Sequence, residues 1–193
     1  MADQLATPED LASLLQLEYA SLTAGQQATL LLLVETATGV VQDAAGGQRI
    51  VAVAGDVVEV MGTHDSWLAL PQIPVTAVAS VTVDGDAITD WKLFGNRLFR
   101  RCGWQVCWDE PSLVSVTCDH GYADGAQELQ NARRAVLAIC QAAYGNPGGL
   151  SSESIDDYKA TYSSLAAALD AAPELKASLR RTYGRRAGLV RVG

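Results

Sequence analysis

The spacing of apolar and polar residues divides the chain into a helical beginning, a strand-rich middle and a helical end. Near the N-terminus, Leu11, Leu14 and Leu15 fall on one face of a helix. Thr7 and Pro8 stand directly before an acidic pair. This order is typical of a helix start, because a hydroxyl caps free amides, proline fits the first turn and acids suit the positive end.

A second, longer helix is predicted from Thr23, with apolar residues at helical spacing for about six turns. Its apolar stripe consists of Leu30, Leu33, Val34, Ala37, Val40, Val41 and Ala44. Leu31 and Leu32 lie off this stripe and widen the apolar face. Either the helix is buried on two sides within one chain, or it also contacts a neighbouring subunit. Gly46 and Gly47 predict its end.

The pattern then changes to a period of two, which is typical of strands. Two short strands are predicted about Gly55-Asp56. In Val75–Val83 an apolar set alternates with Thr76, Ser80 and Thr82, while Val78 breaks the polar face; the apolar set is Val75, Ala77, Ala79, Val81 and Val83. Asp84-Gly85 and Gly95-Asn96 are turn sequences. Six or seven short strands are expected between Arg49 and His120, in an antiparallel sheet with one covered face.

Two further features belong to this middle segment. Pro71 and Pro74 cannot donate hydrogen bonds to a strand ladder, so they predict an ordered, non-pairing entry to the strand that begins at Val75. The segment from Trp104 to Trp108 alternates and predicts another strand.

The helical period returns between Leu129 and Ala143 and is broken by a glycine-rich stretch. The polar stretch that follows is expected to be extended or a loop. Leu165–Ala172 is expected to form a turn or two of helix. Pro173 begins a final short helix that continues to about Tyr183.

This order predicts an α+β fold, in which a bundle of N- and C-terminal helices carries an inserted antiparallel sheet. The predicted parts are the first bundle helices at 1–47, the β-rich insertion at 48–122, the last bundle helices at 123–183 with an extended segment near 150–163, and a flexible basic tail at 184–193.

Charge is unevenly distributed over the 193 residues, which carry a net charge of −8. Residues 174–193 contribute +5 and leave −13 for the rest. An acidic body repels nucleic acid, whereas the basic tail could attract an acidic surface or a phosphate. The longest leucine and valine run is far shorter than the roughly 20 residues of a membrane helix. The acidic N-terminal segment does not resemble a signal peptide, so we expect a cytoplasmic protein.

The cysteines do not have a zinc-site spacing, and we expect them to be unpaired, packed residues. They are Cys102, Cys107, Cys118 and Cys140. His64-Asp65-Ser66 resembles a catalytic cluster only superficially, because triads assemble from separated segments. Cys118 and His120 share a strand face but lack a third metal ligand, so we expect His120 to satisfy a turn. No catalytic residue, metal or cofactor is therefore predicted.

Four tryptophans in the middle segment leave two interpretations open. They are Trp67, Trp91, Trp104 and Trp108. They could form a stacking platform for a sugar, another small ligand or single-stranded nucleic acid. We favour the alternative that they anchor the sheet or an interface, because large amphipathic rings contribute most there.

The order of these features resembles that of the head–tail connector, or adaptor, proteins of long-tailed bacteriophages. The resemblance rests on "TPEDLASLL", the long second helix, "LPQIPVTAVASVTVDG", "VSVTCDHGYADGAQELQNARRAVLAIC", "GLSSESIDDYKATYSS" and "LRRTYGRR". It extends over nearly the whole chain, and the order of the motifs is more specific than any one of them.

The resemblance implies a structural protein of the virion neck, assembled in the host cytoplasm, that forms a homomeric ring, expected to be a dodecamer. It also implies a channel through which genomic DNA passes without sequence-specific binding. The next neck or tail-completion protein would join below. The C-terminal segment would dock onto the portal protein through Arg180, Arg181, Arg185, Arg186, Leu189, Val190 and Arg191. Subunit or neck contacts are expected at Leu31, Leu32, Trp67, Val81, Val83, Trp91, Trp104 and Trp108. A soluble module that binds a ligand or sugar through its tryptophan-rich sheet is the alternative.

Overall fold

The computed structural model describes residues 4–106, 110–145, 152–155, 158–161 and 173–184. It divides the chain into two compact units. The helical unit contains residues 1–47 and 125–193, and the β unit contains residues 48–124.

The first two helices begin at the positions that their caps predict. Helix α1 spans Pro8–Leu14 and helix α2 spans Ala24–Ala44. Thr7 and Thr23 each accept a hydrogen bond from the third helical amide, and the side chain of that third residue returns a bond to the cap. These reciprocal bonds satisfy amides that would otherwise lack partners at a helix start. A 3₁₀ turn at Tyr19–Ser21 connects the two helices.

Helix α3 spans Gln127–Tyr144, and helix α5 spans Pro173–Tyr183. Helices α1, α2 and α3 contact one another, and α5 contacts both α2 and α3. The Tyr183 hydroxyl donates a hydrogen bond to the Glu128 carbonyl, which ties the end of α5 to the first turn of α3. The contacting helices bury an apolar set: Leu11, Leu30, Val34, Ala37, Val41, Leu129, Ala132, Val136, Ile139 and Leu179.

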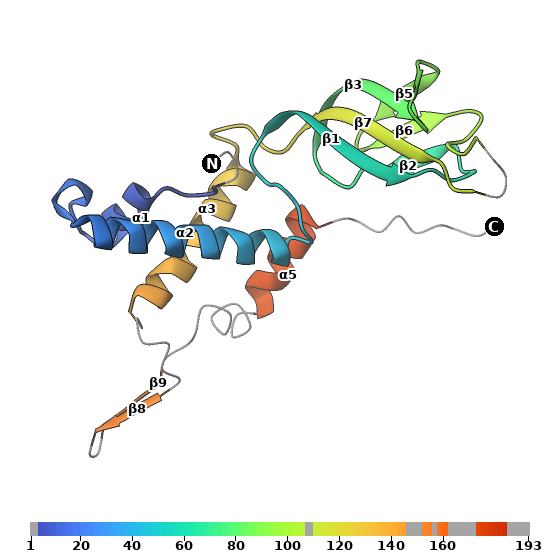
Figure 1. Ribbon diagram of the computed structural model, residues 1–193. Helices are drawn as coiled ribbons and strands as arrows, with labels where there is room; N and C mark the ends of the chain where they lie inside the picture. The colour runs from blue at the N-terminus through green and yellow to red at the C-terminus, as the bar shows by residue number, and fades with distance from the viewer. Residues whose placement is uncertain (1–3, 107–109, 146–151, 156–157, 162–172, 185–193) are drawn as a thin grey trace. The chain divides into compact units, whose positions relative to one another are not determined.

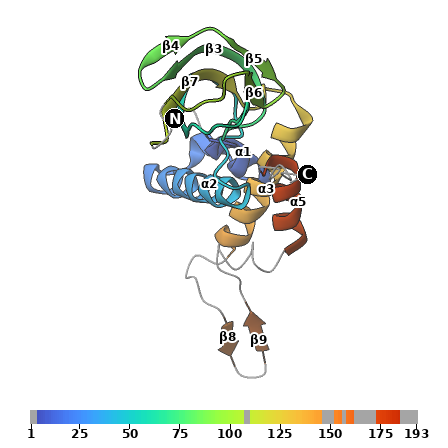
Figure 2. The same ribbon diagram turned by 90° about the vertical axis from the view of Figure 1, so that its right-hand side faces the viewer.

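The fold is α+β, but the expected bundle of N- and C-terminal helices is wrong. Helices α2 and α3 cross steeply in both views instead of lying side by side along a common axis (Figures 1 and 2). The two sheets hold a hydrophobic core of their own, and the helices flank them in the sequence. Apolar periodicity identifies the buried face of a helix, but it does not determine the angle at which two helices cross.

Seven strands lie between residues 53 and 120 among the described residues, and they form two antiparallel sheets. Their bounds are β1 Val53–Met61, β2 Trp67–Ala69, β3 Val75–Val83, β4 Asp86–Ile88, β5 Trp91–Phe94, β6 Arg97–Arg100 and β7 Leu113–His120. The four-stranded sheet has the order β1-β7-β3-β4, and the three-stranded sheet has the order β2-β6-β5. The predicted turns at Asp84-Gly85 and Gly95-Asn96 are confirmed, because they connect paired strands.

Alternate residues of these strands fill one apolar core. The core consists of Val58, Leu68, Leu70, Val81, Val83, Leu98, Trp104, Val114, Val116 and Cys118. In β7 the neighbouring residues are more exposed, as a period of two requires. In β3 two register shifts interrupt the predicted alternation, so that Ala77 and Ala79 are exposed whereas Val78 packs against the core. The predicted antiparallel strands with a covered face are therefore confirmed among the described residues, but the prediction of a single sheet is wrong, because the strands divide into two sheets.

Two local predictions in the β unit are wrong. Gly55-Asp56 does not separate two strands: it lies within β1, where an irregularity shifts the register between Val53 and Asp56. Trp104 lies in a loop, not in a strand, and is completely buried. Its amide donates to Thr63 O at 2.8 Å and its indole donates to Ser66 O at 3.2 Å. These bonds to the β1–β2 connection replace a strand ladder.

The segment between Pro71 and Pro74 is ordered, as predicted. The Gln48 side-chain amide donates to Pro71 O at 2.6 Å, and its oxygen accepts from Ile73 N at 2.9 Å. At the start of β3, Val75 N donates to the Asn96 side chain at 2.9 Å. Side chains thus provide the partners that a strand ladder does not supply here.

Strands β8 (Ser152–Ile155) and β9 (Tyr158–Thr161) pair antiparallel, which confirms the extended segment near 150–163. The predicted final helix is confirmed as α5. The helix expected at Leu165–Ala172 and the tail at 185–193 lie outside the described residues. Among the helices of the described part, none is long and apolar enough to span a membrane.

Candidate functional site

A polar constellation in the β unit joins His120, Asp56 and Arg49. His120 Nε2 lies 2.8 Å from Asp56 Oδ2, and Arg49 Nη1 lies 3.3 Å from Asp56 Oδ1. An ionised carboxylate only accepts hydrogen bonds, so Nε2 carries the donated proton. The His120 bond, followed by the positive charge of Arg49, lowers the pKa of Asp56 despite the opposing effect of burial. The expectation that His120 satisfies a local turn is therefore wrong, because it bonds across to β1.

This constellation lacks the features of a catalytic site. The His120 side chain is fully buried, so a substrate cannot reach it. Neighbouring Cys118 is also buried, and burial raises the pKa of its thiol above the ordinary value, which disfavours a reactive thiolate. In the sequence cluster His64-Asp65-Ser66, the Ser66 hydroxyl donates a hydrogen bond to the backbone carbonyl of Arg101 at 3.4 Å. The described residues contain no cluster of three or more potential metal ligands.

Apolar side chains lie exposed on both units. The large ones are Leu14, Leu31, Leu32, Val57, Met61, Trp67, Phe94, Val106, Leu113 and Tyr144. Some of them are neighbours: Met61 pairs with Leu113 across β1 and β7, and Trp67 contacts Phe94. Single exposed apolar residues are ordinary, whereas groups of them mark surfaces that bind another molecule.

An aromatic group covers the outward side of the three-stranded sheet, and we call it the aromatic face. It contains Trp67, Phe94 and Phe99 with Lys92 and Arg97. The register places Trp67, Phe99 and Lys92 in one row across the sheet. Phe94 and Arg97 form the next row on the same face. The Trp67 ring centroid lies 5.0 Å from that of Phe99 and 5.6 Å from that of Phe94. The three rings thus form one connected, partly exposed cluster.

The charge on this face is positive. Lys92 and Arg97 are exposed, and no ion pair to either is found among the described residues. Arg100 differs because its guanidinium Nε lies 3.0 Å from an Asp90 oxygen. This hydrogen bond is the main reason that the pKa of Asp90 is lowered. The aromatic face therefore presents two cations beside its rings that have no ion-pair partner in the part of the chain that the structure describes.

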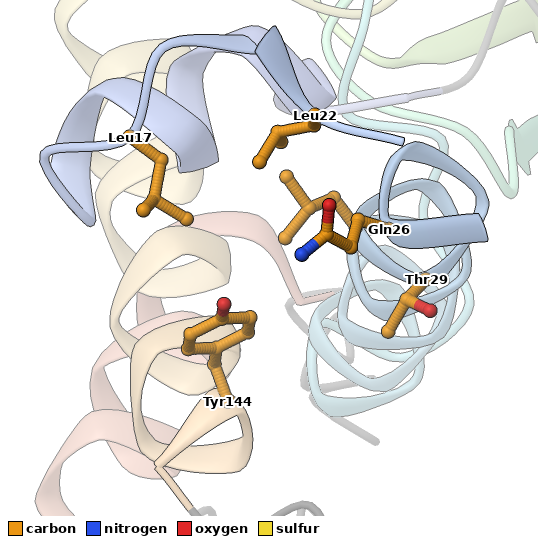
Figure 3. A pocket seen from close by; sticks show the side chains of 6 residues that line it. Leu17, Leu22, Gln26, Thr29 and Tyr144 are labelled. Atoms are coloured by element: carbon orange, nitrogen blue, oxygen red, sulfur yellow. The ribbon is translucent and has the colours of Figure 1, made fainter. Parts of the chain in front are cut away.

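The helical unit carries an apolar pocket, which we call the α2–α3 pocket (Figure 3). Its volume is about 70 Å³, and its lining consists of Leu17, Leu22, Gln26, Thr29, Leu30 and Tyr144. The side chains of Leu17, Gln26 and Tyr144 point toward the same opening. These residues come from the α1–α2 connection, the start of α2 and the end of α3. Exposed Leu32 lies three positions after Thr29 and so neighbours the pocket on the helix surface.

The structure separates the predicted interface residues into exposed and buried groups. Leu31, Leu32 and Trp67 are exposed, and Trp91 is half-buried with its indole donating to Ile88 O at 3.0 Å. By contrast, the core of the β unit already covers a second group: Val81, Val83 and Trp104. We correct their assignment, because apolar side chains that one chain covers completely have no area left for a partner.

The predicted portal-docking residues fall partly outside the described chain. Arg180 and Arg181 are exposed on α5. The other predicted docking residues lie outside the described residues: Arg185, Arg186, Leu189, Val190 and Arg191. The predicted interface residue Trp108 also lies outside them.

Sequence reasoning did not identify most of the aromatic face or the α2–α3 pocket. The signal for Phe94 and Phe99 was present, because they flank a two-residue turn at positions that share one face of a hairpin. The pocket had no comparable signal, since Leu17 and Tyr144 are brought together only by the packing of α3 on α2.

No protein-family model matches the chain, and no curated protein is significantly similar to it.

Proposed function

We propose that this protein is a structural head-to-tail connector, or adaptor, of a long-tailed bacteriophage. It forms a homomeric ring, expected to be a dodecamer, beneath the portal in the virion neck. The ring prolongs the DNA channel, the genome passes without sequence-specific binding, and the next neck or tail-completion protein joins below. Assembly takes place in the cytoplasm of the host bacterium.

The observation that carries this proposal is the grouped exposure of large apolar side chains on both units. Leu32 is 64% exposed, Phe94 is 53% exposed and Trp67 is 47% exposed. Leaving such groups in water is unfavourable by about 25 cal/mol for each Å² of apolar area. A protein whose working form is an assembly can cover these groups with further copies and with its neighbours in the neck.

Two features of the sequence support the same proposal. The order of the helical and strand motifs resembles that of connector proteins along nearly the whole chain. The acidic body would not hold passing DNA, because like charges repel, so the genome could slide through the ring. The basic C-terminal segment carries the opposite charge and is the proposed contact with the portal.

The alternative of a tryptophan-rich ligand-binding sheet receives less support. Trp104 is buried in the core, and Trp91 is half-buried with its indole bonded to a backbone carbonyl. Of the tryptophans in the described residues, only Trp67 is exposed on a sheet face. A platform of several free indoles is therefore not formed by these residues.

The test mixes the purified full chain with rings of the portal protein encoded in the same genome. Electron microscopy then compares the portal alone with the mixture. An added ring on one end of the portal, with a continuous central channel, is the expected result. A chain that neither binds portal rings nor closes into rings would contradict the proposal.

A further inference from the structure

Rings of identical copies require two different surfaces that complement each other. Each copy uses one surface toward the preceding copy and the other toward the next, in a heterologous contact. If the protein forms a ring, as proposed above, its two surfaces should differ in shape and charge. The aromatic face on the β unit and the α2–α3 pocket on the helical unit differ in both respects.

We propose that the aromatic face of one copy docks onto the α2–α3 pocket of the next copy, with Phe94 as the side chain that enters the pocket. This inference rests on the proposed ring and specifies the contact that closes it. It concerns surfaces on two different copies.

The shapes of the two surfaces fit this arrangement. Phe94 ends β5 directly before the two-residue turn, so it lies at the tip of a hairpin and is more than half exposed. Its ring packs at a steep angle against Trp67 and Phe99, which limits its freedom before binding. The pocket has a volume of about 70 Å³. Because a single water needs roughly 10–15 Å³ of cavity volume, the pocket is large enough for several waters or for one apolar side chain.

The charges also complement each other. Lys92 and Arg97 lie beside the rings on the aromatic face. In the helical unit, positions 4 to 47 contain no basic residue, and the charged residues there are all acidic: Glu9, Asp10, Glu18, Glu35 and Asp43. On α3, Arg133 Nε lies 3.9 Å from Asp10 Oδ2, and Arg134 is exposed. Both arginines are about three turns of helix before pocket residue Tyr144. Glu18 is exposed and directly follows pocket residue Leu17. The positive charges of the aromatic face would thus lie near the Glu18 carboxylate at the edge of the pocket. Opposite charges across a contact favour correct pairing and speed association.

Two other occupants of the aromatic face fit less well. If two aromatic faces packed on each other, Lys92 and Arg97 of both copies would be brought together, and like charges disfavour this contact. Single-stranded nucleic acid binds to ring faces that are free for stacking. Here the three rings contact one another at large interplanar angles of 58° to 84°, so parts of their faces are already occupied.

Thiol cross-linking tests the contact directly in the full chain. One variant carries Arg97→Cys and another carries Glu18→Cys, both in a background with Cys102→Ser and Cys107→Ser, which leaves only the buried thiols of Cys118 and Cys140. A short bismaleimide should link the two variants when they are mixed under ring-forming conditions. Each variant alone should give at most about a tenth of that product, because its reactive thiols then lie on surfaces that do not meet. Equal linking by either variant alone would overturn the inference in favour of a symmetric contact.

Charge reversal provides an independent test. Arg97→Glu alone and Glu18→Lys alone should each raise the protein concentration at half-assembly by about tenfold. The double variant should recover to within about threefold of the wild type, because the opposite charges are exchanged. Asp43→Lys is the matched control, since it makes the same type of change near the other end of α2 and should have little effect.

The outcomes separate this inference from the proposed function. A wild-type ring that tolerates both reversals and gives no mixed cross-link would overturn the docking arrangement while the connector proposal stands. A wild-type chain that forms no ring, with or without portal, would overturn both.

Discussion

His120 Nε2 lies 2.8 Å from the Oδ2 atom of Asp56, and this contact joins the end of the central strand β7 to the edge strand β1. Arg49 holds the other oxygen of the same carboxylate at 3.3 Å. The neighbouring Gly55 amide donates to Asp119 at 2.7 Å. These contacts fix β1 at the irregularity between Val53 and Asp56, where the regular ladder is interrupted.

Asp56→Ala is therefore expected to destabilise the β unit by about 1–3 kcal/mol, because it leaves a buried imidazole without its carboxylate. Denaturant titration followed by tryptophan fluorescence measures this effect, since all four tryptophans lie in residues 48–124. Asp56→Asn retains an oxygen that can accept the His120 bond and should lose less stability. Equal stability of all three proteins would show that the contact contributes nothing.

The same contact predicts a dependence on pH. The pKa of Asp56 is lowered in the folded chain, so ionised Asp56 favours folding. This contribution is complete above the unfolded pKa of about 3.9 and is lost as the pH falls through the lower folded value. The stability difference between wild type and Asp56→Ala should therefore shrink on acidification below about pH 4. A difference that grows below that pH would contradict the assigned direction.

Leu30 and Leu32 are only two positions apart on α2, but one side chain is buried and the other is exposed. Leu30 is 1% exposed and Leu32 is 64% exposed. Leu30→Ala should cost about 2–5 kcal/mol, whereas Leu32→Ala should change stability by no more than about 0.5 kcal/mol. Helical circular dichroism during denaturation tests both values. If Leu32 contributes to assembly, Leu32→Ala should weaken ring formation without loss of folding, and unchanged assembly would remove it from the interface.

Gly62 and Gly39 are a matched pair for substitution by alanine. A Cβ on Gly62 would lie 1.9 Å from the Trp104 carbonyl oxygen, whereas a Cβ on Gly39 would meet nothing within 4 Å. Gly62→Ala should cost about 1–3 kcal/mol because backbone atoms must move. Gly39→Ala should raise the stability of α2 by up to about 1 kcal/mol, because alanine favours a helix interior. Thermal unfolding of both variants checks the opposite signs.

Removal of residues 185–193 tests the portal contact separately from the fold. The truncated chain keeps α5 and its Tyr183 bond to Glu128, so its circular dichroism spectrum should resemble that of the full chain. Its affinity for portal rings should fall by about tenfold or more, because three arginines and an apolar pair are lost. Unchanged affinity in a sedimentation or interferometry assay would refute docking by this segment.

Local signals in the sequence predicted most of the elements. Thr7 and Thr23 mark helix starts through capping interactions that involve only neighbouring residues. The strand order β1-β7-β3-β4 and the steep crossing of α2 and α3 were not predictable in this way. Both depend on contacts between residues far apart in the sequence, which a local pattern does not record.

The predicted interface residues also show that a local sequence pattern does not record contacts between distant residues. The predicted alternation correctly indicates a covered side at the end of β3, where Val81 and Val83 lie, but it does not reveal that the same chain covers that side. Val81→Lys and Val83→Lys would therefore disturb folding and are unsuitable tests of assembly. Trp67, in contrast, keeps its predicted place on an exposed surface, where Phe94 and Phe99 complete the group.

The most direct measurement of the central claim is the mass of the full-length protein by native mass spectrometry over a range of concentrations, with and without portal rings. We expect one closed homomeric species with a fixed number of copies, formed at high concentration or on addition of portal, and we expect that number to be twelve. A protomer mass under every condition, with no portal-bound form, would contradict it.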